Sequence, residues 1–243
     1  MTWRLQLYWQ GRRDDDGRHG EQAIAFARAF SEAWPPGALS WRWTHPETGA
    51  RAPLEHPGDW RAALAASAVR WRCGARTVES YVLDAYAERE GVKLLDCKLT
   101  LGVRLDELPG LFLPNQAKVL VHRAVGDADA VTATLWAALC AAVSAFDPDW
   151  GHGGTDDAPT EALPMFDDGA PLPGWWTYLS TRAGGELTLA PPAVMHPVSG
   201  MGVLVVAHPK LFNPRSEEHL LAVESVRDAM ASAGLLTPVE VEG

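Results

Sequence analysis

The sequence predicts an α+β fold in a single domain, with mixed or antiparallel sheets flanked by helices. Segments of period two and segments of helical period follow one another in the order βαβαββ, then βα, an irregular segment and ββα. The 243 residues, 47% of them hydrophobic, suffice for a large core. Because no linker is long enough to separate two domains, we expect residues 1–243 to fold together.

The first half of the chain predicts strands interleaved with two helices. At its start Trp3, Leu5, Leu7 and Trp9 alternate with more polar neighbours, which is typical of a half-buried strand. The other predicted elements are a charged turn over 11–20, a helix over 21–34, a short strand around Trp41 and Trp43, a helix over 58–68, and strands over 77–86 and 93–105 joined by a turn at 88–91.

The second half begins with an apolar strand over 117–124. A long helix follows, which Asp127 or Asp129 caps and which ends near Phe146. Residues 147–173 are rich in Pro, Gly and Asp and predict an irregular segment. The remaining elements are a short helix or strand at 175–180, strands over 186–190 and 193–207, and a final helix with Asn213 as its N-cap and Gly234 at its end. The shared element order suggests two related halves, 1–115 and 116–243.

Charge is distributed unevenly along the chain. Residues 1–123 hold 17 basic and 15 acidic residues, whereas residues 124–243 hold 4 basic and 16 acidic ones, which together give the net charge of −10. Between Arg123 and Arg182 there is no lysine or arginine, but there are nine acids. An acidic surface repels nucleic acid and anionic membranes and attracts a basic protein surface. The charge pattern therefore favours a protein partner and disfavours nucleic acid or membrane.

Composition also bears on compartment and cofactors. Cys73, Cys97 and Cys140 are odd in number and widely spaced, so neither a disulfide framework nor a zinc site is expected. The N-terminal residues lack the apolar region of a signal peptide, and no run approaches 18 apolar residues. We therefore expect a reduced, cytoplasmic protein without a membrane span or a cofactor.

A search for catalytic constellations gives one weak candidate. The chain has no Gly-rich phosphate loop after a strand, no HExxH and no GxSxG motif. Gly151-His152-Gly153-Gly154 lies just before Asp156 and Asp157, and a histidine with two acids in a glycine-rich loop can bind a divalent ion. The same composition is also ordinary for a loop, so a metal-dependent hydrolase remains an alternative and not the main hypothesis.

Two groups stand out among the eleven tryptophans. Five of them lie on apolar faces of predicted elements, which favours a place in the core: Trp3, Trp9, Trp34, Trp60 and Trp136. Trp150, Trp175 and Trp176 lie in or beside the acidic segment, where an aromatic side chain is either a lid on the core or an interface anchor. Since Trp175 and Trp176 are adjacent, only one of them is expected to point inward on a strand.

The second half resembles a known group of proteins. The run Gly174-Trp175-Trp176-Thr177-Tyr178-Leu179-Ser180 is similar to the G-W-x-x-Y-L element of bacterial immunity proteins, which neutralise toxins of polymorphic-toxin and type VI secretion systems. After it come the apolar run 202–206, the segment His208–Pro214 and a closing helix with His219 and Ala222. In this order the chain resembles the family called immunity protein 52 over roughly residues 115–240.

The resemblance implies a protein that binds and blocks a cognate toxin, with no catalytic residue to carry over. The usual partners of that family are toxins of the restriction-endonuclease fold, and a nuclease needs a basic cleft that an acidic loop can occupy. A scaffold protein without a toxin partner, and an acidic loop that is merely solvated, remain alternatives. The residues predicted to contact the toxin are Asp147, Asp149, Trp150, Asp156, Asp157, Glu161, Asp167, Asp168, Trp175 and Trp176.

Overall fold

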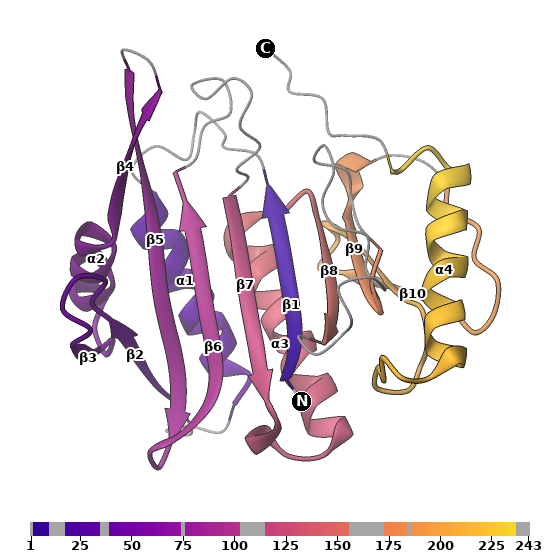
Figure 1. Cartoon of the computed structure of the whole chain (residues 1–243), viewed down its shortest axis with the longest axis horizontal. Coiled ribbons are helices and arrows are strands. Elements are labelled where there is room, and N and C mark those ends of the chain that lie inside the picture. The colour runs from indigo at the N-terminus through magenta and orange to yellow at the C-terminus, as the bar shows by residue number, and fades with distance from the viewer. Residues whose placement is uncertain are drawn as a thin grey trace.

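One eleven-stranded sheet runs through the molecule and carries helices on both faces (Figure 1). This computed structural model describes residues 2–9, 18–34, 39–73, 76–102, 115–155, 173–183 and 186–236. The strands are β1 (Thr2–Trp9), β2 (Ser40–Thr44), β3 (Arg51–Pro53), β4 (Ala68–Cys73), β5 (Arg76–Arg89), β6 (Val92–Leu101), β7 (Asn115–His122), β8 (Trp150–Thr155), β9 (Trp176–Ser180), β10 (Val194–Val198) and β11 (Gly202–Val206). The helices are α1 (His19–Glu32), α2 (Pro57–Ala66), α3 (Ala128–Phe146) and α4 (Glu217–Ser232), with short 3-10 turns η3 (Arg123–Val125) and η4 (Thr181–Ala183).

The strand order is β10-β11-β9-β8-β1-β7-β6-β5-β2-β3, and β4 pairs with β5 outside this path. Every strand pair among the described residues is antiparallel, so the predicted α+β class is confirmed. β1, from the start of the chain, lies between β7 and β8 of the second half, so both halves of the chain contribute to one sheet. Whether residues 1–115 and 116–243 are related repeats stays a prediction.

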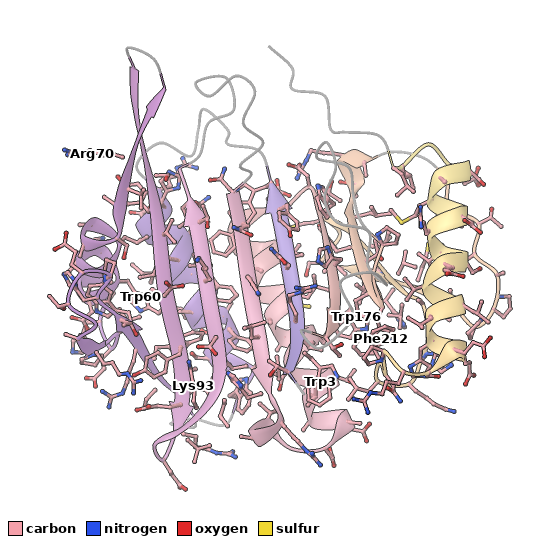
Figure 2. The ribbon with its side chains drawn as sticks, in the orientation of Figure 1. Trp3, Trp60, Arg70, Lys93, Trp176 and Phe212 are labelled. Atoms are coloured by element: carbon pink, nitrogen blue, oxygen red, sulfur yellow. The ribbon has the colours of Figure 1, made fainter. Side chains whose placement is uncertain are left out.

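The predicted alternation of the first strand is confirmed in β1. Trp3, Leu5, Leu7 and Trp9 belong to the main core, which lies between the sheet and the helices α1, α2 and α3. The core spans the whole width of the sheet, since Trp60 and Trp176 lie toward opposite ends of it (Figure 2). The predicted hairpin between β5 and β6 is confirmed too, with its turn at residues 90–91, where both φ angles are positive.

α3 is the central helix of that core. Its N-cap is Asp127, whose Oδ1 accepts a hydrogen bond of 2.9 Å from the backbone N–H of Ala130, so the first of the two predicted caps is the right one. α3 has the length and mean hydropathy, 1.5, of a membrane-spanning helix. The apolar composition of α3 is accounted for by its packing between α1 and the sheet, and its sequence is not an unbroken apolar run.

α4 covers the opposite face of the sheet at one end only. Its inner residues Ala222, Val226 and Met230 pack on Tyr8, Trp150 and other residues of a second, smaller core over β8, β9 and β11. The predicted cap needs correction: the helix begins at Glu217 after Ser216, while the side chain of Asn213 accepts a hydrogen bond from the N–H of Arg215. The predicted strand over 186–190 is irregular chain, and 193–207 is the β10–β11 hairpin.

The larger correction concerns the predicted irregular segment over 147–173. Its beginning is β8, an inner strand between β1 and β9. The glycines that indicate a loop are needed for close packing: a Cβ on Gly151 would overlap the Leu7 side chain and lie 2.7 Å from the carbonyl oxygen of Gln6. A Cβ on Gly153 would lie 3.1 Å from Cβ of Trp176. The strand therefore depends on small residues at positions where composition alone indicates a turn.

Candidate functional site

Asp147 and Asp149, the first two predicted contact residues, are joined to Arg182. Asp147 ends α3 with a left-handed backbone, φ 47°, and Asp149 leads into β8. Arg182 Nη1 donates hydrogen bonds of 2.9 and 2.7 Å to the two carboxylate oxygens of Asp147, and Nε donates one of 3.1 Å to Asp149. Arg182 Nη2 also donates to the carbonyl oxygens of Asp147 and Pro148. The geometry therefore gives these two acids an intramolecular role, which fixes the corner between α3 and β8.

All three predicted aromatic anchors are buried, which fits the alternative of a lid on the core, and their contact with a toxin stays a prediction. Trp150 is 3% exposed and stacks on Tyr8 beneath α4, with ring centroids 4.3 Å apart. Trp175 and Trp176 are 2% and 3% exposed and stack on each other. Trp175 precedes β9 and donates its indole N–H to the carbonyl oxygen of His208 at 2.7 Å, so it turns inward as well. None of the three presents an indole ring on the surface of the folded chain.

The histidine of the weak catalytic candidate lies inside the sheet. His152 belongs to β8, is 9% exposed, and has no hydrogen-bond partner at Nδ1. Burial, with smaller contributions from Arg4 and Lys118, lowers the pKa of His152 to about 3. The predicted glycine-rich loop is therefore a strand with a neutral imidazole. The hydrolase alternative assumes a histidine in an accessible loop, and the structure does not provide one at residue 152.

The other acids of the predicted contact set lie outside the described residues. These are Asp156, Asp157, Glu161, Asp167 and Asp168. Their part in binding stays a prediction.

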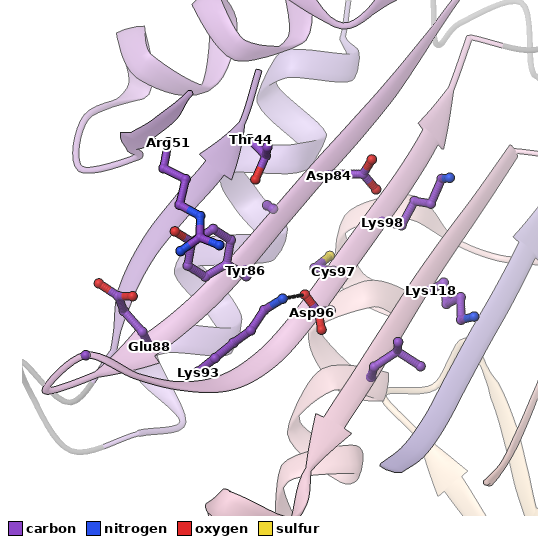
Figure 3. A pocket seen from close by; sticks show the side chains of 13 residues that line it. Thr44, Arg51, Asp84, Tyr86, Glu88, Lys93, Asp96, Cys97, Lys98 and Lys118 are labelled. Carbon is purple, nitrogen blue, oxygen red and sulfur yellow. Dashed lines mark ion pairs between the residues drawn. The ribbon is translucent and has the colours of Figure 1, made fainter. Parts of the chain in front are cut away.

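A broad depression of about 490 Å³ lies on the sheet face that α1, α2 and α3 leave open (Figure 3). Lys93 and Lys98 reach it from β6, Lys118 from β7 and Arg51 from β3. Acids are interspersed among them: Asp96 forms an ion pair with Lys93 and a hydrogen bond of 2.7 Å with Nε2 of His122. The guanidinium of Arg51 and the ammonium of Lys93 lie over the ring of Tyr86, 5.6 and 5.1 Å from its centroid.

The depression has the character of a solvated sheet face on which neighbouring basic and acidic side chains offset each other's charge. Its one sulfur nucleophile, Cys97, is buried, and burial raises the pKa of the thiol, as do Asp84 and Asp96. The thiolate is therefore not accessible as a nucleophile. The alternating charges suit a polar sheet face in water better than a site for an anionic ligand.

His208, Glu218 and His219 form the one cluster of metal-ligand type among the described residues. The backbone N–H of Lys210 donates to Nδ1 of His208, and the N–H of Asn213 donates to Nδ1 of His219. In a neutral imidazole these bonds place the ring hydrogen on Nε2, and Nε2 of His208 lies 3.1 Å from Glu218 Oε1. A metal would need a lone pair on Nε2, which the hydrogen on that nitrogen occupies, so the arrangement fits a hydrogen-bonded link at the start of α4 better than a metal site.

The outer face of α4 is an acidic stripe whose residues are absent from the predicted contact set. Glu217, Leu221, Glu224 and Asp228 follow at helical spacing, and all four are exposed. Leu221, 56% exposed, lies between the acids. We refer to these four residues as the α4 stripe. The spacing i, i+4, i+7, i+11 in the final helix is the signal by which the sequence itself indicates this face.

Comparisons with known proteins place these features in context. No curated protein sequence matches the chain. Among solved structures, the Pseudomonas aeruginosa type VI secretion system protein PA0821 has a similar fold, with a TM-score of 0.54 and 13% identity over 100% of this chain and 77% of that one. The family model described as immunity protein 52 matches residues 117–239, which is just over half of the chain. The chain therefore belongs to the immunity protein 52 family.

Proposed function

We propose that this protein binds a nuclease toxin in the cytoplasm and neutralises it by occluding its nucleic-acid-binding cleft with an acidic surface. Membership of an immunity family supports the toxin-neutralising role. The nuclease as target rests on charge: residues 124–243 hold 16 acids against 4 bases, and a nuclease must present basic residues to phosphates. A surface that imitates the charge of nucleic acid competes for the same cleft.

The described acids of this half support that proposal by their exposure. The carboxylates of Asp127 and Asp129 at the start of α3 are exposed, as are the three acids of the α4 stripe. Figure 1 places α4 at the end of the molecule opposite α2 and β3, so the stripe is not overlaid by the helices of the main core. Exposed acids near a binding surface raise the association rate with a basic partner and make that rate sensitive to salt.

The predicted contact acids then divide into two roles. Asp147 and Asp149 hold Arg182 and so position the corner between α3 and β8. Asp156, Asp157, Glu161, Asp167 and Asp168 remain proposed toxin contacts, on the strength of their position in a stretch without lysine or arginine. The proposed mechanism is steric and electrostatic, and it requires neither a catalytic residue nor a cofactor.

The direct test uses the product of the adjacent toxin gene. We expect the purified chain to bind that toxin and to abolish its cleavage of DNA or RNA in a stoichiometric ratio. Reversal of Asp156, Asp157, Asp167 and Asp168 to lysine together should slow association and weaken its dependence on salt. A toxin that is bound and neutralised but has no nuclease activity would refute the nuclease target and leave the immunity role intact.

A metal analysis distinguishes the inhibitor from the metal-dependent hydrolase. An inhibitor of this kind is expected to purify without a stoichiometric metal ion, whereas a metal-dependent hydrolase built on His152 should retain one. Turnover of a hydrolase substrate by the purified chain, lost in a His152→Ala variant, would decide for the enzyme.

A further inference from the structure

An apolar groove of about 510 Å³ lies between α3 and the β10–β11 edge of the sheet. Trp136 and Ala133 of α3 form one wall, while Val194 of β10 and Val206 of β11 contribute to the other. Trp175 and Trp176 also line it. These two tryptophans, which the sequence offers as core lids or interface anchors, are 2% and 3% exposed, so they contribute to the inner side of the groove.

Exposed apolar side chains gather at this groove. Five large hydrophobic residues are exposed in the described part of the chain, and two of them, Trp136 at 37% and Val194 at 43%, line the groove. Met195, 47% exposed, follows Val194 on β10 but lies outside the groove lining, because successive side chains of a strand point to opposite faces. Single exposed apolar residues are ordinary, but a cluster around a cavity is characteristic of a binding surface.

The ring of Trp136 is held in place before any partner arrives. It meets Trp176 edge to face, with centroids 6.3 Å apart and planes at 86°, and meets His196 at 6.3 Å and 78°. An aromatic side chain that is already oriented loses little conformational entropy on binding, which is a property of interface hot spots. The indole N–H of Trp176 is buried beside it with no hydrogen-bond partner.

The groove opens at the edge of the sheet and carries negative charge. β10 is the outermost strand on this side, and its first four residues are exposed. Asp129 is the one carboxylate in the groove lining, and Asp127, the N-cap of α3, lies two residues before it. An apolar cavity with an acidic rim is complementary to an apolar side chain that is flanked by a basic residue.

We infer that this groove is the anchoring site for the toxin, and that it receives an aromatic or branched aliphatic side chain from a basic segment of that partner. This inference rests on the proposed function, because it names where on the same partner the contact is made. The acidic surface steers the toxin to the protein, and the groove around Trp136 retains it once it has arrived. The two surfaces therefore control different steps of binding.

The experiment compares Trp136→Ala and Val194→Ser with the matched control Val92→Ala. Val92 is also an exposed hydrophobic, 52% exposed, but it lies on β6 at the hairpin with β5. Binding of each purified full-length variant to the toxin is measured as association and dissociation rates at two salt concentrations, with thermal unfolding as a check on folding. We expect both groove variants to dissociate about 10- to 100-fold faster with an unchanged salt dependence of association, and the control to behave as wild type.

Three outcomes overturn the inference. The first is wild-type dissociation from both folded groove variants while the wild-type protein binds the toxin. The second is a concentration-dependent dimer that Trp136→Ala abolishes, which would assign the groove to a second copy of this chain. The third is a loss of thermal stability without a change in binding, which would make the groove structural. Absence of any binding by the wild-type protein would instead refute the proposed function.

Discussion

Arg182 holds Asp147 through both carboxylate oxygens, with Nη1 2.9 Å from Oδ1 and 2.7 Å from Oδ2. The same guanidinium donates to Asp149 and to two backbone carbonyls at the end of α3. Because Asp147 has a left-handed backbone, the arginine fixes a turn that an ordinary residue disfavours. One side chain thus joins the end of the core helix to the turn after β9.

We predict that Arg182→Ala lowers the free energy of unfolding by about 1 to 2 kcal/mol. The pair is half-exposed, so the charge contributes little, but several charge-assisted hydrogen bonds are lost together. Arg182→Lys should recover less than half of the loss, since an ammonium cannot reproduce the bidentate contact. Urea denaturation measures the effect, and Arg227→Ala on the exposed side of α4 is the control, expected to change stability by less than about 0.5 kcal/mol.

A second prediction follows from the close packing of β8 against β1. Gly151→Ala should destabilise the protein by about 1 to 3 kcal/mol, because the new methyl group would overlap the Leu7 side chain and the carbonyl oxygen of Gln6. Gly154→Ala is the matched control on the same strand, since a Cβ there has nothing within 4 Å. Equal stabilities of the two variants in thermal and chemical unfolding would contradict the close packing assigned to Gly151.

The buried imidazole of His152 predicts a dependence of stability on pH. Its pKa is lowered to about 3, whereas an unfolded histidine titrates near 6.5, so between these values the unfolded chain binds more protons. Stability should therefore fall as the pH drops below about 6.5, by up to about 1.4 kcal/mol per pH unit from this residue. His152→Leu should remove that part of the slope. A wild-type and a variant protein with parallel profiles between pH 4 and 6 would refute the assignment.

The strands and helices that could be predicted are those whose burial pattern is local. The alternation of Trp3, Leu5, Leu7 and Trp9 predicts β1, and Asp127 predicts the start of α3. β8 could not be predicted, because residues 151–154, three glycines and one histidine, have the composition of a loop. Its extended form follows from β1 and β9 on either side, which are distant in sequence.

The candidate site, too, could be predicted only in those parts that depend on local sequence. The charge asymmetry is a property of the sequence and points to a basic partner. Which acids are available to that partner depends on tertiary contacts: Arg182 lies more than 30 residues beyond Asp147 and Asp149, yet it pairs with both. The burial of Trp150 likewise depends on α4, whose residues come far later in the chain. Sequence periodicity could have indicated the α4 stripe, because its acids repeat within a single helix.

The final prediction concerns the effect of the α4 stripe on the rate of toxin binding. Reversal of Glu217, Glu224 and Asp228 to lysine changes the charge by six units at one end of the molecule. If this face meets the basic cleft, the association rate should fall by about tenfold or more at low salt, and the rates should converge as salt rises.

The matched control reverses three exposed acids outside that region, Glu47, Glu55 and Glu90, which changes the net charge by the same six units. Stopped-flow association at several salt concentrations compares the two triple variants, and thermal unfolding verifies that α4 remains folded. A local role for the stripe requires the control to associate clearly faster than the stripe variant. If both triple variants are slowed equally, only the net charge of the protein matters, and the acids of α4 do not face the toxin in the complex.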